Sequence, residues 1–223
     1  LVAAPRRADS HASTPVLPSS LDVGQKLRLL SVPQDQVHPG DGCHCIGSRL
    51  RVATRDGYGK ALLDLGKINP NVVALDADLS DSTRSEYFGK EFPERFFSMG
   101  IAEQDMIGAA AGLAFSGKIV YASTFAIFSE RAFEFTRNII SRNKLNVKIA
   151  GSHSGIATGE DGKSAQAIED IAIYRALPNM IVLQPSDSVE AEKMVFALAD
   201  YKGPSYMRMH RNPVPIIHGQ DYK

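Results

Sequence analysis

Glu103 is the residue of this sequence best suited to acid–base chemistry. It follows the turn Met99-Gly100, which separates a strand-like segment from an apolar helical one. A carboxylate in the first turn of a helix is stabilised by free backbone N–H groups and by the helix dipole. The alternative is an ordinary solvated first-turn carboxylate, and these residues alone leave both interpretations open.

The residues behind Glu103 indicate a second property of the same helix. Residues 107–114 are mostly glycine and alanine, including Gly108 and Gly112. Side chains this small allow another helix to approach closely. We therefore predict that this helix is buried at an interface.

Other polar groups follow apolar segments that read as strands. The apolar segment 71–76 leads into an acidic loop that contains Asp78 and Ser82, and segment 146–150 leads into a loop that contains His153. In open α/β sheets, ligands bind beyond the carboxyl ends of the strands. These loops are therefore candidate parts of a binding site.

The elements that must position these side chains alternate between strand and helix from residue 54 onward. This alternation predicts an α/β fold with a mostly parallel sheet and helices on both faces. Thr54 is expected to cap a helix that ends at Gly66, and Ser164 to cap a second one. The expected helices are 54–66, one before residue 96, one from Glu103, 125–141, 165–177 and 188–199; the expected strands are 71–76, 96–98, 118–122, 146–150, 180–183 and 205–209.

Composition limits the classes of function. The chain has 223 residues, 43% of them apolar and 22% charged, with a formal net charge of zero. Without a basic excess, neither nucleic acid nor an anionic membrane surface is expected as a partner. No apolar run reaches the roughly 20 residues that span a bilayer. Cys43 and Cys45 complete neither a zinc site nor a disulfide framework, so we expect a reducing, cytoplasmic location.

Residues 1–51 differ from the rest of the chain in composition and in hydrophobic periodicity. They contain five prolines, scattered serine and arginine, and no sustained helical or strand period, apart from one short helical pattern at 23–30. We predict a disordered leader over 1–51 and a single domain over 52–223. The chain begins without Met, and a transit-like segment or the end of a longer protein both fit.

Two familiar patterns are interpreted as coincidences. Residues 157–164 resemble a relaxed P-loop, but the preceding strand is expected to end at Ala150, and Glu160 and Asp161 would repel phosphate. Gly40-Asp41-Gly42, with Asn69 further on, resembles the diphosphate and metal motif of thiamine enzymes, but no buried strand precedes Gly40.

Several motifs together resemble the pyrimidine-binding domain of transketolase, and the likeness covers residues 53–211. They are Gly100-Ile101-Ala102-Glu103-Gln104, Ser123-Thr124-Phe125-Ala126 with Phe128, Gly159-Glu160-Asp161-Gly162, and Pro185-Ser186-Asp187. The resemblance implies the thiamine diphosphate-binding fold. It also implies thiamine-dependent transfer of a two-carbon ketol unit between sugar phosphates.

The resemblance implies specific cofactor contacts. Glu103 matches the catalytic residue that hydrogen-bonds the aminopyrimidine of thiamine diphosphate, where a carboxylate in a dry interface favours the reactive imino tautomer. Phe125 and Phe128 match aromatics that pack on the pyrimidine, although by spacing alone they would be ordinary core. Asp78 is expected to help at the interface.

The substrate residues are implied in the same way. Arg55, Ser82 and Arg211 match groups that hold the sugar phosphate, and the planar fork of arginine pairs well with phosphate oxygens. His153 and Asp161 match contacts to the sugar hydroxyls or phosphate; the alternatives are a capped loop histidine and a turn carboxylate. Sugar preference is open, because Ala165 stands where relatives carry His or Gln and cannot donate a hydrogen bond.

The resemblance also implies a partner. A full transketolase has a diphosphate-binding domain, which the sequence does not show, so we expect either a fragment or the C-terminal-type subunit of a split transketolase. The partner would bind most of the Mg²⁺ or Ca²⁺, this chain none, and the assembly would be a dimer or heterotetramer. The alternatives are a deoxyxylulose phosphate synthase-like enzyme, a P-loop nucleotide hydrolase and a non-catalytic interaction domain.

Overall fold

The main sheet of the protein is parallel throughout. The computed structural model describes residues 50–219 and 221–222, so the short helical pattern at 23–30 and the two cysteines lie outside the described residues. The six strands have the order β3-β2-β4-β5-β7-β6. They are β2 (Val72–Asp76), β3 (Phe96–Ser98), β4 (Ile119–Phe125), β5 (Val147–Ser152), β6 (Ile181–Leu183) and β7 (Ser205–Arg208).

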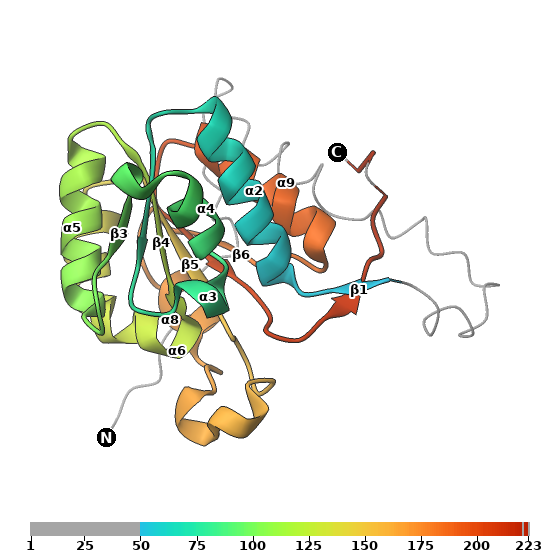
Figure 1. The fold of residues 1–223 in the computed structure, drawn as a ribbon. Coiled ribbons are helices and arrows are strands. Elements are labelled where there is room, and N and C mark those ends of the chain that lie inside the picture. Colours follow the sequence, from blue (N-terminus) through green and yellow to red (C-terminus); the bar gives the residue numbers. More distant parts are fainter. Residues whose placement is uncertain (1–49, 220, 223) are drawn as a thin grey trace, which may run out of the picture.

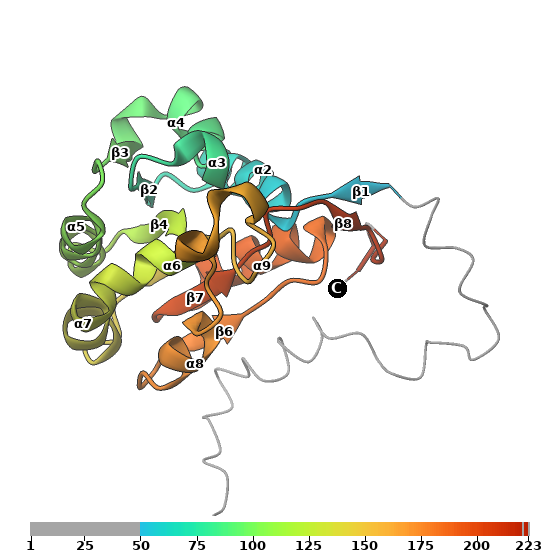
Figure 2. The same ribbon diagram turned by 90° about the horizontal axis from the view of Figure 1, so that it is seen from below.

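Helices cover both faces of this sheet, as the alternating pattern predicts (Figures 1 and 2). One face packs on α2 (Thr54–Ile68), α4 (Glu86–Glu91) and α9 (Ser188–Asp200). The other packs on α5 (Glu103–Phe115), α7 (Phe133–Phe135) and α8 (Asp170–Arg175). Successive β2 residues belong to the hydrophobic cores on opposite faces of the sheet: Val72 and Ala74 lie in the core with α2, and Val73 and Leu75 in the core with α5. The predicted α/β fold class is therefore confirmed.

The carboxyl ends of the central strands meet at one edge of the sheet. Asp76 of β2 pairs in register with Ser123 of β4, and Phe125 at the end of β4 pairs with Ser152 of β5. The helices α2 and α5 begin at this same edge, at the bottom of the view in Figure 1. The polar loops after β2 and β5 are thereby brought together.

The start of α2 differs from its sequence-based prediction. Ala53 occupies the N-cap position without a side-chain cap, and Thr54 is the first helical residue. The Thr54 hydroxyl instead accepts a hydrogen bond, at 2.8 Å, from the backbone N–H of His210. A tertiary contact thus replaces the local cap. The helix continues through Gly66 to Ile68. Gly66 serves packing instead of ending the helix, because the rings of Phe88 and Phe92 leave no room for a side chain there.

Two predicted helices are wrong in their extent. Phe125 is the last residue of β4, so the long helix predicted from it is a series of short turns instead: α6 (Ala126–Ser129), η5 (Glu130–Ala132), α7 and the π-helical η6 (Thr136–Ser141). Ser164 does not cap a helix over 165–177. Residues 163–165 form the 3₁₀ turn η8 (Lys163–Ala165), and α8 begins only at Asp170.

The remaining elements are short. The turn α3 (Ser80–Thr83) follows β2, η4 (Pro93–Arg95) precedes β3, and η7 (Gly159–Asp161) lies in the loop after β5. A separate antiparallel pair joins β1 (Arg51–Val52) to β8 (Val214–Pro215). Within the described part of the chain, no helix is both long and apolar enough to cross a membrane.

Candidate functional site

A pocket of about 670 Å³ opens at the carboxyl edge of the sheet. It lies between the start of α2, the turn after β2, the ends of β4 and β5, and the loop of η7 and η8. Its lining residues are Arg55, Leu79, Ser82, Arg84, Phe125, Phe128, Arg131, His153, Asp161, Ser164, Ala165 and Arg211. The pocket therefore brings together residues that are far apart in the sequence.

Arg55 lies at the centre of the polar wall of the pocket. One Arg55 N–H donates to the backbone carbonyl of Ser82 at 2.8 Å, and the same nitrogen lies 3.3 Å from Nε2 of His153. The Nε of Arg55 is buried and has no hydrogen-bond partner among the described residues. Three residues predicted to hold substrate thus share one wall, and one buried donor in it has no partner among the described residues.

His153 is held as a neutral ring. Its side chain is 2% exposed, its backbone φ is +57°, and its ring stacks on Phe125 with centroids 3.7 Å apart. Burial, followed by the charges of Arg55, Arg211 and Arg84, lowers the pKa of His153 to about 3. Its Nδ1 lies 3.0 Å from the Ser152 hydroxyl. His153 is therefore an uncharged donor and acceptor in a cationic wall.

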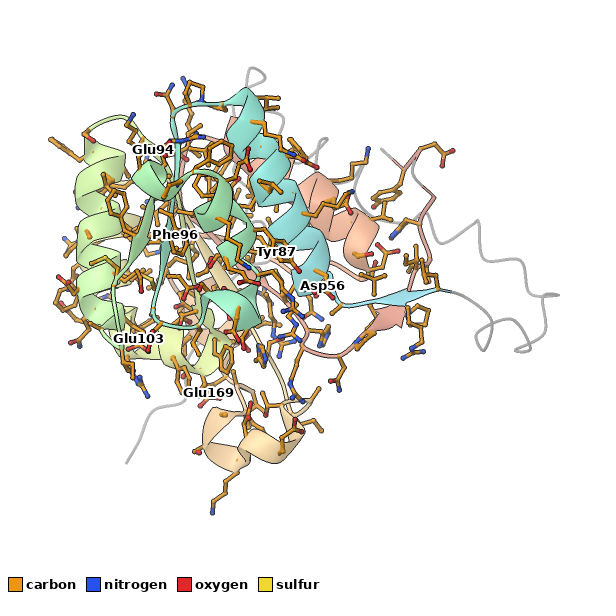
Figure 3. The ribbon with its side chains drawn as sticks, in the orientation of Figure 1. Asp56, Tyr87, Glu94, Phe96, Glu103 and Glu169 are labelled. Atoms are coloured by element: carbon orange, nitrogen blue, oxygen red, sulfur yellow. The ribbon has the colours of Figure 1, made fainter. Side chains whose placement is uncertain are left out.

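Glu103 lies beside the pocket and is reached through Arg131. The Glu103 side chain is buried, and its Oε1 accepts from Arg131 at 2.9 Å. The Arg131 guanidinium also lies over the ring of Phe128, at 4.4 Å from the centroid. Glu103 itself is not among the lining residues, and Figure 3 shows it at the start of α5. The Arg131 guanidinium thus links Glu103 to the lining of the pocket.

Phe125 and Phe128 form an apolar wall. Their rings stack with centroids 5.5 Å apart and planes 12° apart. Phe125 is the last residue of β4, and Phe128 lies in α6, which follows that strand directly. Two flat rings beside a buried carboxylate suit a planar heterocycle that carries a hydrogen-bonding ring nitrogen.

The other predicted residues lie at the rim or outside the pocket. Arg211 lines it while bonding to the carboxylate of Glu160 and, at 3.4 Å, to the Thr158 carbonyl; the exposed Asp161 also lines it. Asp78 is exposed in a left-handed backbone conformation and is not in the lining. The structure thus brings seven of the nine predicted site residues into one pocket and leaves Glu103 and Asp78 outside it.

Asp76 organises the turn that carries Ser82. It is fully buried at the end of β2 and accepts hydrogen bonds from the Leu79 N–H, at 2.6 Å, and from the hydroxyls of Thr83 and Ser85, at 2.7 and 2.8 Å. Burial raises the pKa of Asp76 to about 6, against these hydrogen bonds, which lower it. A strand-end carboxylate therefore fixes α3 against the sheet.

The sequence reasoning missed Arg84 and Arg131. Arg131 follows Phe128 by three residues, a spacing that places two side chains on one helical face, and this signal was available. Arg84 had no comparable signal, because its place in the pocket depends on a tertiary contact with α2. Both arginines line the pocket.

The residues present fit the aminopyrimidine half of thiamine diphosphate better than they fit a metal. The aromatic pair provides an apolar wall, and the buried Glu103 provides a carboxylate. Among residues 50–219 and 221–222, no three His, Cys, Asp or Glu side chains gather as a metal site would need. The P-loop interpretation fails locally, because segment 157–164 leads into a 3₁₀ turn rather than a helix.

The fold and the pocket define an α/β protein whose cationic binding site lies at the carboxyl edge of a parallel sheet covered on both faces. Comparison with known families makes this specific. The transketolase pyrimidine-binding domain matches residues 51–216, and the chain belongs to this family.

Two sequence relatives agree with this assignment. A protein described as a transketolase C-terminal section, from Methanocaldococcus jannaschii, is 56% identical over 165 residues, which are 74% of this chain and 52% of that protein. Human transketolase is 39% identical over 203 residues, 91% of this chain and 30% of the human protein. The chain therefore spans about half of one relative and under a third of the other.

Solved structures give the same result. A split-gene transketolase, described as an inactive beta4 tetramer, matches with a TM-score of 0.69 and 53% identity over 76% of this chain and 55% of that one. Transketolase from Campylobacter jejuni matches with a TM-score of 0.70 and 26% identity over 90% of this chain and 32% of that one. The resemblance to transketolase that the motifs indicate is confirmed.

Proposed function

We propose that this chain supplies the pyrimidine side of a thiamine diphosphate-dependent transketolase, which transfers a two-carbon ketol unit between sugar phosphates. The observation that carries the proposal is the connection from Glu103 through Arg131 to Phe128. It places a buried carboxylate and an aromatic stacking surface side by side, next to a pocket lined by arginines.

Each residue has a role in this proposal. Glu103 binds the pyrimidine ring nitrogen and holds the proton that it shares with that nitrogen. Phe125 and Phe128 orient the ring by stacking. When bound, thiamine diphosphate supplies the nucleophilic carbon that accepts the ketol unit. The protein itself binds and orients the cofactor and keeps water away from that carbon.

The polar wall binds the substrates. Arg55 and Arg211 pair with the sugar phosphate, and the backbone turn at Ser82 helps to enclose it. His153 is neutral and contacts the sugar without attracting the phosphate away from the arginines. Ala165 is buried in the lining and leaves space where a polar side chain would contact the sugar.

We propose further that the site is completed by a diphosphate-binding domain or subunit, which also holds most of the divalent metal. The exposed face of α5 supports this. A Cβ at Gly108 or Gly112 would have nothing within 4 Å. Ile101, two residues before α5, and Phe115, its last residue, are 76% and 85% exposed. Exposed apolar surface of this kind is typical of a protein interface.

The experiment that tests this function is replacement of Glu103 in the enzyme reconstituted with such a partner. Glu103→Ala should reduce turnover by at least about 10²-fold, as expected for a lost acid–base group. Glu103→Gln keeps the size but cannot share the proton, and should lose nearly as much. Circular dichroism of the variant chains controls for folding. Near-normal turnover by a folded Glu103→Ala chain would rule the proposal out.

A further inference from the structure

Arg84 is held in an unusual backbone conformation beside the pocket. It follows α3 with φ of 69° and ψ of 7°, in the left-handed region that residues other than glycine seldom adopt. Gly59 of α2 makes room for it, because a Cβ there would lie 2.4 Å from the Arg84 Cβ and 2.7 Å from its carbonyl oxygen. Conformations of this kind are concentrated at functional sites.

The guanidinium of Arg84 is tethered through two of its three nitrogens. Its Nε donates to Oδ1 of Asp56 at 2.7 Å, and one Nη donates to the Asp81 carbonyl at 2.7 Å. Figure 3 shows Asp56 at the start of α2. Arginine has five N–H donors, so three remain after these two bonds. None of the three has a hydrogen-bond partner within residues 50–219 and 221–222, and Arg84 lines the pocket.

Four arginines line the pocket, and Asp161 is the one carboxylate among its lining residues. Arg84, Arg131 and Arg211 pair with Asp56, Glu103 and Glu160. Arg55 pairs with no carboxylate in the described chain. Burial, and next the nearby charge of Arg84, lower the pKa of Arg55, whereas the charges of Asp56 and Asp81 raise it. Bringing like charges together is unfavourable unless an anion lies between them.

We propose that Arg84 is a specificity-determining residue of the pocket, whose free N–H donors bind the substrate phosphate beside Arg55. Together the two arginines favour a phosphorylated sugar over the same sugar without phosphate. The sugar part of this inference rests on the proposed function. The phosphate part concerns this chain alone.

The first test measures binding of inorganic phosphate to the full chain by titration calorimetry. Arg84→Asn removes the guanidinium while suiting the left-handed backbone, and should weaken binding about tenfold or more, the cost expected for a lost charged hydrogen bond. Arg84→Lys keeps the charge but not the planar fork, and its affinity for phosphate should lie between those of the wild type and Arg84→Asn. Arg175→Gln, on an exposed residue of α8, is the control and should bind like the wild type. Equal phosphate binding by wild type and Arg84→Asn, or no binding by the wild type, would overturn the proposal.

The second test uses the enzyme reconstituted with its partner at saturating ketose donor. Arg84→Asn should raise KM for ribose 5-phosphate about tenfold with little change in kcat, and leave KM for unphosphorylated ribose unchanged. An equal rise for both acceptors would refute a phosphate-specific role. If the wild-type mixture shows no ketol transfer, the proposed function fails, while the calorimetry still decides whether Arg84 binds phosphate.

Discussion

Neutral His153 illustrates how the pocket sets the chemistry of a single residue. Arg55 can only donate, so Nε2 of His153 is the acceptor in their 3.3 Å contact, and the ring proton lies on Nδ1, facing the Ser152 hydroxyl at 3.0 Å. The ring is stacked on Phe125 and enclosed by arginines, which is why its pKa falls to about 3. Both ring nitrogens of this tautomer are therefore engaged within the chain.

This gives a pH prediction for His153. Its imidazole resonance, identified by its absence in His153→Asn, should show no titration above about pH 4. The unfolded chain takes up a proton near pH 6.5 that the folded chain does not, so the stability that neutral His153 contributes is present above pH 6.5 and is lost as the pH falls toward 3. NMR titration of the folded chain checks this, and a midpoint near 6.5 would contradict it.

Sequence reasoning identified the pocket residues that belong to motifs and missed those that depend on tertiary contacts. Arg55, His153 and Arg211 were named from resemblance, and the fold places them in one pocket although 98 residues separate Arg55 from His153. Arg84 depends on the space that Gly59 leaves, which no local pattern encodes. The roles of all these residues remain proposals.

Among the elements, α2 and α5 use glycine in opposite ways. Gly59 of α2 is enclosed, because an added Cβ would meet Arg84 at 2.4 Å and Tyr87 at 3.0 Å. Gly108 of α5 faces open space. The first glycine serves packing within the chain, whereas the second leaves a smooth face for another chain.

We predict that Gly59→Ala and Gly108→Ala have opposite effects on the lone chain. Gly59→Ala should lower the free energy of unfolding by about 1–3 kcal/mol through overpacking. Gly108→Ala should raise it by up to about 1 kcal/mol, since alanine is the better helix former, yet weaken assembly with the partner. Urea unfolding and sedimentation measure the two effects. Equal destabilisation by both, or unimpaired assembly of Gly108→Ala, would contradict this interpretation.

The elements themselves were predicted best where the period was clear. The alternation of strands and helices gave the class, and α9 was predicted within a residue because Asp187 caps it locally, accepting from the Glu190 N–H. The sequence predicts one helix over residues 125–141 because their apolar spacing is helical. The structure instead divides residues 126–141 into several short helical turns. Pairing with β5 extends β4 to Phe125, and the local hydrophobic period of the sequence does not report such a long-range contact.

At the scale of the whole molecule, we propose that the described residues contain one side of a site. The pocket is lined by aromatic rings and arginines, and within the described residues no three His, Cys, Asp or Glu side chains gather as a metal site would need. The matched relatives are longer than this chain, and the split-gene neighbour is described as inactive as a beta4 tetramer. Under the proposed function, we expect ketol transfer only when this chain is assembled with a diphosphate-binding partner.

The most direct test of this account is transketolase activity of the chain, alone and mixed with a diphosphate-binding transketolase subunit. The assay contains thiamine diphosphate, Mg²⁺, xylulose 5-phosphate and ribose 5-phosphate. We predict ketol transfer in the mixture and none from either chain alone. Activity of the isolated chain would show that it holds more than half of the site, and an inactive mixture with a partner proven competent would contradict the proposed function.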